Sequence, residues 1–325
     1  MHIVAAPDKF KGTATAAEIS AAIAAAAVER GHTCAQVPLA DGGDGTLEAL
    51  GGPNRTSLVT GPLGEPVEAE WRLDGGVAVI EMARTSGLVL AGGPDGNDPL
   101  TASTTGVGEL ISEAVEHGAR KVIVGVGGSA TTDGGLGAID AIGSAQRFAD
   151  VDVVVACDVR TRFVDAAAVF GPQKGASPAQ VKMLTNRLTT LVDTYKDRFG
   201  VDVSKLERAG AAGGLAGGLA ALGARLEDGF GIVAEQVGLH AELEAADLVV
   251  TGEGSVDNES FEGKVVGGVV ALANSHEIPV LAIAGQVVDG VEARIDAVSL
   301  TEEFGLERAQ SAPGPCVREA LLHHF

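Results

Sequence analysis

Apolar residues in this chain are concentrated in short, nearly continuous runs. The runs span residues 2–8, 34–42, 121–128, 153–159, 246–254, 279–285 and 296–300. Most of them lack the alternation of apolar and polar positions that a half-exposed strand shows. Continuous apolar runs are typical of parallel strands that helices cover on both faces. The pattern therefore predicts an α/β fold with a doubly wound, mostly parallel sheet.

Helical patterns lie between several of these runs. They span residues 15–31, 107–118 and 177–200. Thr15 with Glu18, and Ser177 with Gln180, have the spacing of a capping box, in which each side chain bonds the other residue's backbone N–H. A glycine closes each segment at the position where a helix commonly stops. These signals predict helices with defined ends.

The segment 56–83 has a different pattern. Half-polar runs alternate there with the turn sequences "GPLGEP" and "DGG", which predicts antiparallel strands. We therefore expect a second, mixed α/β domain. The predicted division places residues 1–60 with 245–325 in a Rossmann- or flavodoxin-like domain, and residues 61–244 in the mixed domain.

The length of 325 residues favours two domains. Acidic residues outnumber basic ones by 44 to 23, which gives a net charge of -21. Nucleic acids and anionic membranes are therefore unexpected partners, because both require a positive surface. The long uncharged run 209–224 is also too short to span a bilayer.

The cysteines indicate the compartment. Cys34, Cys157 and Cys316 are far apart and show no metal-ligand spacing, which favours a reducing environment. The first residues do not have the pattern of a signal peptide. We expect a cytoplasmic protein, and a homodimer is one assembly that the sequence allows.

Acids and lysines follow the carboxyl ends of the predicted strands, where open α/β sheets bind ligands. They are Asp8, Lys9 and Lys11 after the first run, Asp41 after the second, Asp133 and Asp158 after the third and fourth, and Glu253 and Asp257 after the fifth. Asp is also a common turn residue. Five acid-bearing loops at one end of a sheet nevertheless favour a ligand site.

The glycine-rich stretch 125–135, "GVGGSATTDGG", allows two interpretations. Gly125, Gly127 and Ala130 match the spacing of a dinucleotide fingerprint, with Asp150 near the distance expected for a ribose ligand. However, Asp133 would then lie near a pyrophosphate and repel it unless a cation intervened, as Mg²⁺ does in a kinase. The residues alone leave both interpretations open.

Two further loops have the composition of anion sites. "FGPQKGAS" places Lys174 and Gly175 directly before a capped helix, whose free N–H groups favour anions. "TGEGSVDNESFEGK" ends in Gly263 and Lys264 after a buried run. Either loop could instead be a solvated connection.

Several segments occur in an order that resembles the type I glycerate kinase family. They are "APDKFKGT" (6–13), "PLADGGDGT" (38–46), "TSGL" (85–88), "TTGVGELI" (104–111), "GVGGSATTDGG" (125–135), "ACDV" (156–159), "VFGPQKGA" (169–176), "GAAGGL" (210–215), "TGEG" (251–254) and "GK" (263–264). The resemblance implies two α/β domains with an active site in the cleft between them. It also implies the use of ATP and Mg²⁺ to phosphorylate glycerate at its 2-hydroxyl, giving 2-phosphoglycerate.

Phosphoryl transfer depends on positioning and charge neutralisation, and these needs suggest roles for the residues above. We expect Asp158, Asp8, Asp41 and Lys9 to be catalytic, with Asp158 favoured as general base. Gly127, Gly128, Ser129, Lys174, Gly175 and Lys264 are expected to bind the nucleotide phosphates, together with Lys11. Arg84 and Ser86 are the acceptor candidates, and Asp133, Glu253 and Asp257 are the candidate Mg²⁺ ligands.

Three segments differ from the family pattern, at Thr132, at 161–163 ("TRF") and at 255–259 ("SVDNE"). We expect the last two to change the preferred acceptor. The alternatives are therefore a kinase of another small 2-hydroxy acid, an NAD-dependent oxidoreductase, and a non-catalytic sensor of small molecules.

Overall fold

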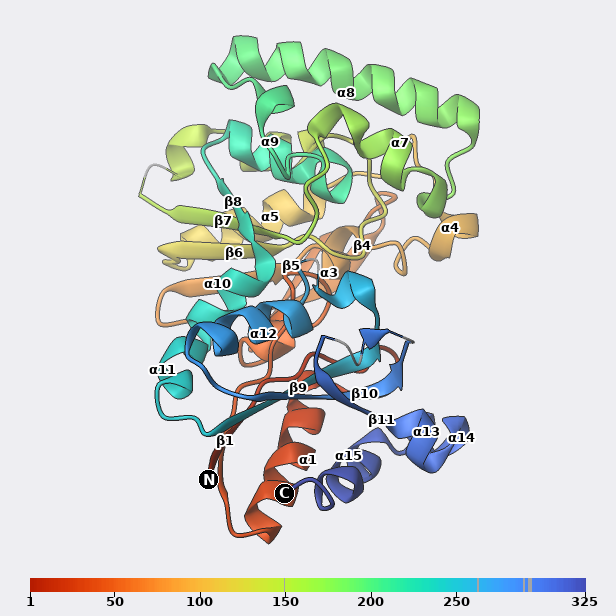
Figure 1. The fold of residues 1–325 in the computed structure, drawn as a ribbon. Coiled ribbons are helices and arrows are strands. Elements are labelled where there is room, and N and C mark those ends of the chain that lie inside the picture. Colours follow the sequence, from red (N-terminus) through yellow and green to blue (C-terminus); the bar gives the residue numbers. More distant parts are fainter. Residues whose placement is uncertain (149, 262, 289, 292–293) are drawn as a thin grey trace. The chain divides into compact units, whose positions relative to one another are not determined.

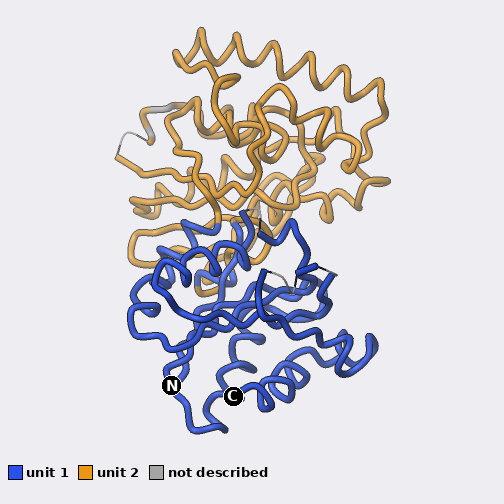
Figure 2. The backbone as a smooth tube through the Cα atoms, in the orientation of Figure 1, with its two compact units in different colours: residues 1–41, 48–50, 230–325 blue, residues 42–47, 51–229 orange. Residues whose placement is uncertain are grey.

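Two separate β-sheets organise the chain, and each belongs to a different unit (Figure 2). The structure, a computed structural model, describes residues 1–148, 150–261, 263–288, 290–291 and 294–325. Unit 1 consists of residues 1–41, 48–50 and 230–325, and unit 2 of residues 42–47 and 51–229. Each unit is thus assembled from segments that are distant in sequence.

The five-stranded sheet of unit 1 is parallel throughout, with the strand order β11-β10-β9-β1-β2. Its strands are β1 (His2–Ala5), β2 (Thr33–Gln36), β9 (Leu248–Val256), β10 (Val280–Val287) and β11 (Asp296–Ser299). From β1 the chain winds outward to β2, and from β9 it winds in the other direction through β10 to β11. The boundary between β1 and β9 is therefore the topological switch point of the sheet.

Helices cover both faces of this sheet (Figure 1). They are α1 (Ala16–Glu29), α10 (Gly229–Gln236), α11 (Leu239–Leu243), α12 (Val265–Ser275), α13 (Leu300–Phe304), α14 (Leu306–Ser311) and α15 (Pro313–Leu321), with the 3-10 turn η6 (Asn258–Phe261). Ile3 of β1 packs with α1 and α15, whereas its neighbour Val4 packs with α10, α11 and α12. Alternate residues of a strand point to opposite faces, so both faces must be apolar.

Unit 2 contains a mixed six-stranded sheet in the order β3-β4-β5-β6-β7-β8. Its strands are β3 (Arg55–Thr60), β4 (Pro66–Asp74), β5 (Val77–Glu81), β6 (Lys121–Gly125), β7 (Asp152–Cys157) and β8 (Arg225–Asp228). The β3–β4 and β4–β5 pairs are antiparallel, and the remaining pairs are parallel. The predicted fold class, a doubly wound parallel sheet plus a mixed α/β domain, is confirmed.

The helices of unit 2 are α3 (Ala83–Ser86), α4 (Gly93–Gly96), α5 (Thr105–Glu116), α6 (Leu136–Ile142), α7 (Ala166–Phe170), α8 (Pro178–Phe199) and α9 (Leu215–Ala221), with η1 (Ala145–Phe148), η2 (Phe163–Asp165), η3 (Pro172–Lys174), η4 (Val203–Lys205) and η5 (Ala211–Gly214). One large core joins the sheet to α5, α6, α7, α8 and α9. The short helix α2 (Thr46–Ala49) crosses the unit boundary in sequence.

The unit boundaries differ from the predicted ones at 60/61 and 244/245. Residues 51–60 belong to unit 2 because Arg55–Thr60 pairs along its whole length with β4. Residues 230–244 belong to unit 1, because Val233 and Leu239 pack into the same core as β1. A segment belongs to the unit whose strands or core residues it contacts, and the local sequence alone does not show which contacts form.

The predicted helix signals are confirmed in detail. Thr15 and Ser177 are N-caps with complete capping boxes, and α8 ends at Gly200 in the left-handed conformation. The pattern missed β8, whose sequence "RLED" is polar because it forms an edge of the sheet. In the part of the chain that the structure describes, no helix has both the length and the apolar character needed to cross a membrane.

Candidate active site

The loop after β6 contains the glycines of the predicted nucleotide motif. The N–H of Val126 donates to the carbonyl of Gly42 at 3.1 Å. A Cβ on Gly127 would lie 2.7 Å from the Cα of Gly43, and one on Gly125 would lie 3.0 Å from the oxygen of Gly42. These glycines therefore allow residues 42–46 to approach the loop closely.

This packing argues against the dinucleotide interpretation. A dinucleotide fingerprint opens its helix within the motif, so that the helix N-terminus meets the pyrophosphate. Here α6 begins at Leu136, and Ala130 bonds instead to the backbone of Ser86 at 3.0 Å. The glycine spacing has a structural cause that requires no dinucleotide.

Lys174 is buried at the end of η3, with only 2% of its surface exposed. Its Nζ donates to the carbonyl of Thr131 at 2.6 Å and to the Oγ of Ser129 at 3.1 Å. Burial lowers the pKa of Lys174 to about 7, while nearby Asp133 acts in the opposite direction. A lysine placed in this way is available to bind an anion, because a second negative charge would favour its charged form.

A pocket of about 190 Å³ in unit 2 brings together five of the predicted site residues. They are Gly127, Gly128, Ser129, Asp158 and Lys174. Leu88, Val126, Val159 and Phe170 form its apolar wall, and Gln173, Ala211 and Ala212 complete it. The pocket therefore combines a buried cation and a carboxylate with an apolar surface, in a volume that suits a small organic acid.

Asn97 supports this pocket, although its sequence context gave no sign of a role. Its Nδ2 donates to the carbonyl of Ala130 at 3.0 Å and to that of Lys174 at 2.9 Å. One side chain thus ties the loop after β6 to the loop that carries the lysine. Gly175 next to it has φ +89, and a Cβ there would lie 2.1 Å from the oxygen of Pro94. Its predicted role in phosphate binding has a structural alternative.

Asp133 does not fit its predicted role as a metal ligand. Its Oδ2 accepts hydrogen bonds from the N–H and hydroxyl of Thr104 and from the N–H of Gly137, at 2.8–3.2 Å. Its Oδ1 accepts from the N–H of Gly135 at 3.0 Å. The carboxylate is thus committed to the first turns of α5 and α6, where negative charge is favourable.

Arg84 is also committed to structure, contrary to its predicted contact with the acceptor. It forms ion pairs with Glu81, at 3.1 Å, and with Glu70. Glu81 is 2% exposed and also accepts from the N–H of Leu47 at 2.9 Å. The pair therefore anchors residues 42–47 to β5. Ser86 is fully buried, so its hydroxyl is enclosed by protein.

The segment 161–163 lies outside the pocket as the described residues define it. Phe163 is fully buried in the core, and Thr161 accepts a backbone bond from Gly210 at 3.0 Å. Arg162 is exposed. Within this departure from the family pattern, Phe163 contributes to the core of unit 2.

In unit 1, Asp8, Asp41 and Glu253 gather at the switch point between β1 and β9. The backbone N–H of Asp8 donates to the carbonyl of Gly252 at 2.8 Å, and Lys9 donates its N–H to the Asp8 carboxylate at 2.7 Å. Burial raises the pKa of Asp8 to about 7, opposed by Lys9 and reinforced by Asp41 and Glu253. Carboxyl groups whose pKa values are raised by burial and by one another would be stabilised in their charged form by a bound cation.

Glu253 is the member of this group best suited to a cation. Burial raises the pKa of Glu253, and the charges of Asp257 and Asp41 raise it further, while Ser260 and Lys264 oppose this. Its Oε1 is buried with no hydrogen-bond partner among the described residues. Lys264 stands at the N-cap of α12, and Lys11 is exposed.

Asp257 is partly occupied by its own loop. Its Oδ1 accepts from the N–H of Ser260 at 3.0 Å and from the Ser260 hydroxyl at 3.3 Å. Among the residues described, no three His, Cys, Asp or Glu side chains are arranged to enclose a metal ion. Mg²⁺ commonly binds one or two carboxylates together with phosphate oxygens and water, and Glu253, whose Oε1 has no partner among the described residues, fits this mode.

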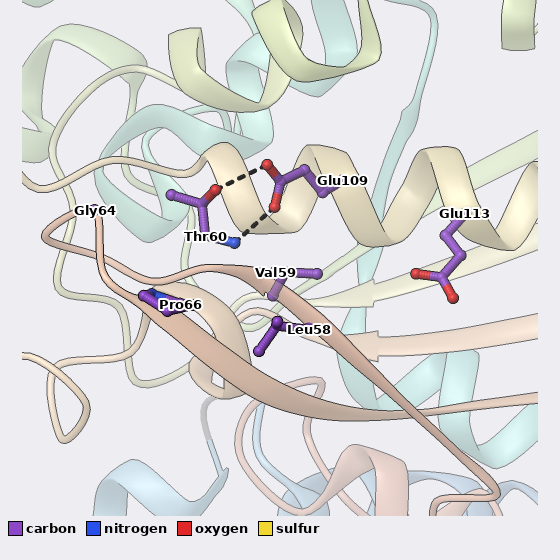
Figure 3. Close-up of a pocket in the computed structure, with 7 residues that line it drawn as sticks. All are labelled: Leu58, Val59, Thr60, Gly64, Pro66, Glu109 and Glu113. Atoms are coloured by element: carbon purple, nitrogen blue, oxygen red, sulfur yellow. Dashed lines mark hydrogen bonds between the residues drawn. The ribbon is translucent and has the colours of Figure 1, made fainter.

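A second pocket, of about 400 Å³, lies between the β3–β4 hairpin and α5 (Figure 3). Figure 3 shows Glu109 directed toward Thr60, whose N–H and hydroxyl donate to it at 2.7 and 2.8 Å. Glu113 on the same helix accepts from Ser57 at 2.7 Å. Both carboxylates therefore hold the edge strand β3 against α5, and none of the predicted site residues lines this pocket.

Comparisons with known proteins agree on one family. The model of the glycerate kinase family matches residues 3–146 and 143–320. A glycerate 2-kinase of Escherichia coli (strain K12) is 40% identical over 336 residues, covering 90% of this chain and 87% of that protein. A glycerate kinase of Bacillus subtilis (strain 168) is 39% identical, with 88% and 85% covered.

The fold agrees with these sequence matches. A crystal structure described as that of a candidate glycerate kinase 2 from Salmonella typhimurium LT2 has a TM-score of 0.84 and 34% identity. The match between the two structures covers 100% of this chain and 98% of the Salmonella typhimurium chain. Because the sequence and fold matches extend over most of the chain, this chain belongs to the glycerate kinase family.

Proposed function

We propose that this chain transfers the γ-phosphoryl group of ATP to the 2-hydroxyl of glycerate and forms 2-phosphoglycerate. The observation that carries the proposal is the pocket of about 190 Å³ that contains the buried Lys174 and Asp158. Pockets that enclose whole drug-sized ligands generally measure about 300 Å³ or more. The smaller volume favours the three-carbon acceptor over the nucleotide as its occupant.

Lys174 is the group that we propose binds the glycerate carboxylate. The other candidate, Arg84, is occupied by Glu81 and Glu70. Among the described residues, the Lys174 ammonium donates hydrogen bonds only to two neutral oxygens, from Thr131 and Ser129, so a carboxylate would give it a directly bonded negative partner. A charge-assisted hydrogen bond of this kind is about twice as strong as a neutral one.

Asp158 is the general base in this proposal. It follows β7 and lines the same pocket as Lys174. In kinases an aspartate typically accepts the proton of the attacking hydroxyl. Asp8 is nearly buried among other acids, which suits charge neutralisation better than contact with an acceptor.

We assign Asp8, Asp41 and Glu253, the acidic cluster of unit 1, to binding of the nucleotide. Glu253 would hold Mg²⁺, which neutralises charge on the phosphates when it is bound. The charge of Lys9 acts on Asp8, and that of Lys264 acts on Glu253. We propose that these two lysines contact phosphate oxygens. The same assignment leaves Asp133 as a structural residue.

The test is an assay of ATP consumption with a panel of small 2-hydroxy acids, repeated with Lys174→Met. We expect glycerate to be the preferred acceptor. The variant should lose at least about tenfold in kcat/KM for glycerate, because a charge-assisted contact is worth about 1.5–3 kcal/mol. Lys182→Met is the matched control, since Lys182 lies exposed on α8.

Two outcomes would contradict the proposal. No turnover of glycerate by the parent protein would exclude the reaction. Equal losses in the Lys174 and Lys182 variants would remove the pocket from the acceptor site. Product analysis by phosphorus NMR identifies the phosphorylated hydroxyl.

A further inference from the structure

The segment η5 contains a strained backbone beside the acceptor pocket. Ala212, Gly213 and Gly214 adopt left-handed conformations in succession, with φ values of 53°, 65° and 93°. Glycine adopts this conformation readily, whereas a residue with a Cβ pays a steric cost. Ala212 is therefore the strained member of the run.

The two glycines have no alternative at their positions. A Cβ on Gly213 would lie 2.0 Å from the carbonyl oxygen of Thr131, and one on Gly214 would lie 2.8 Å from the ring of Phe163. The oxygen of Gly213 also accepts from the N–H of Gly134 at 3.1 Å. The loop 131–134 thus fixes the left-handed run, as strained backbone requires support from its surroundings.

At Ala212 a side chain does fit, and the residue lines the acceptor pocket. It is 8% exposed. The carbonyl of Thr131 that approaches Gly213 also accepts the hydrogen bond from Lys174. The wall at Ala212 and the position of the lysine therefore rest on the same loop.

We infer that Ala212 determines acceptor specificity, and that its methyl group limits the length of the carbon chain that the pocket accepts. A glycine here would relieve the backbone strain, but it would also remove that wall. The inference rests on the proposed function, because it assigns the pocket to the acceptor acid.

The test compares Ala212→Gly with the parent on glycerate and on its four-carbon homologue, 2,3,4-trihydroxybutanoate. The ratio of kcat/KM for the homologue to that for glycerate should rise by about tenfold or more, the lower end of what one carbon is worth in a fitted pocket. Glu277→Gly is the matched control. Glu277 also has a positive φ, of 59°, but it is exposed in unit 1.

Thermal unfolding provides a second measurement on both variants. Their melting temperatures should be unchanged or higher, because both substitutions relieve the backbone strain of a non-glycine residue in the left-handed conformation. A folded Ala212→Gly protein with the parental acceptor ratio would overturn the inference, as would an equal change in Glu277→Gly.

The test also separates this inference from the proposed function. If the parent does not phosphorylate glycerate, the proposed function fails, and calorimetric binding of the two acids to parent and variant still tests Ala212. An increased relative affinity of the variant for the longer acid would support its role, and an unchanged relative affinity would overturn it.

Discussion

Lys174 shows how burial sets the behaviour of a single side chain. Its ammonium is enclosed with 2% exposure, and burial lowers its pKa to about 7. Above that pH the Lys174 amine of the free protein is neutral. Binding of a carboxylate to the charged ammonium then requires uptake of a proton by Lys174. Affinity for an anionic acceptor then depends on pH near neutrality.

We therefore predict that KM for glycerate rises as pH increases above about 7, by up to about tenfold per pH unit. Steady-state kinetics from slightly acidic to alkaline pH would measure this rise. Lys174→Met should have a higher KM than the parent at slightly acidic pH and should lack the dependence. An identical pH profile in the variant would assign the titration to another group.

The same lysine should influence stability in the opposite direction. Its pKa in the folded protein lies below the value of 10.5 for the free side chain, so between these values the unfolded chain binds more protons. The free energy of unfolding should then rise with pH across this window, by up to about 1.4 kcal/mol per unit. Denaturant titrations at several pH values would show whether the free energy of unfolding of the parent rises with pH relative to that of Lys174→Met.

Asp158 and Asp8 can be separated by substitution to asparagine. Asp158→Asn should lower kcat by about 100-fold or more, as expected for the loss of a general base, while KM for glycerate changes little. Asp8→Asn should mainly raise KM for Mg-ATP, because Asp8 belongs to the acidic cluster of unit 1. Initial-rate kinetics with each substrate varied would reveal a reversed pattern.

Asp133 acts at the scale of elements, because it joins the first turns of α5 and α6. Four hydrogen bonds converge on its two oxygens. Asparagine keeps one acceptor oxygen and introduces a donor where Thr104 or Gly135 also donates. The side chain therefore fixes the relative position of the two helices and of the glycine loop before them.

We predict that Asp133→Asn lowers the free energy of unfolding by about 1–3 kcal/mol, the cost of unsatisfied buried groups. Urea denaturation would measure it. Asp140→Asn is the control, because Asp140 lies on α6 with 62% of its side chain exposed and pairs with Arg198 at 3.7 Å. A stable Asp133 variant that has lost only its metal dependence would restore the metal role.

At the scale of the whole molecule, a net charge of -21 must accommodate an anionic nucleotide. Two like charges about 4 Å apart repel by about 4 kcal/mol at an effective dielectric constant near 20. Under the proposed function, the acids around Glu253 would therefore favour binding of ATP as its Mg²⁺ complex, in which a cation lies between the negative groups.

ATP should accordingly raise the melting temperature more with Mg²⁺ than with EDTA, since a ligand of the folded state adds RT ln(1 + [L]/Kd). Glu253→Gln should remove most of that difference. Glu259→Gln, a change at an exposed residue of η6, should preserve it. NADH should cause no shift, and a metal-independent shift with NADH alone would contradict the kinase assignment.

The amino-acid pattern by itself determined the local structure. The capping boxes at Thr15 and Ser177, the glycine stops and the continuous apolar runs depend on contacts between near neighbours in the chain. The sequence also predicted loops at Asp158, which follows a strand end, and at Lys174, which precedes a capped helix, and the structure places both residues in one pocket. The order of the quoted motifs identified the family before any contact was known.

Tertiary structure decided how the acidic and basic side chains are used. Asp133 and Arg84 matched a metal ligand and a carboxylate ligand by residue type, but both are occupied by helix N-termini and by Glu81 and Glu70. Asn97 gave no local signal, and Ala212 lay within the quoted "GAAGGL" motif without a role of its own, because the support of Asn97 and the role proposed for Ala212 both depend on segments more than 30 residues away. The sequence determines the charge of a side chain, whereas its hydrogen-bond and ion-pair partners depend on how distant segments pack together.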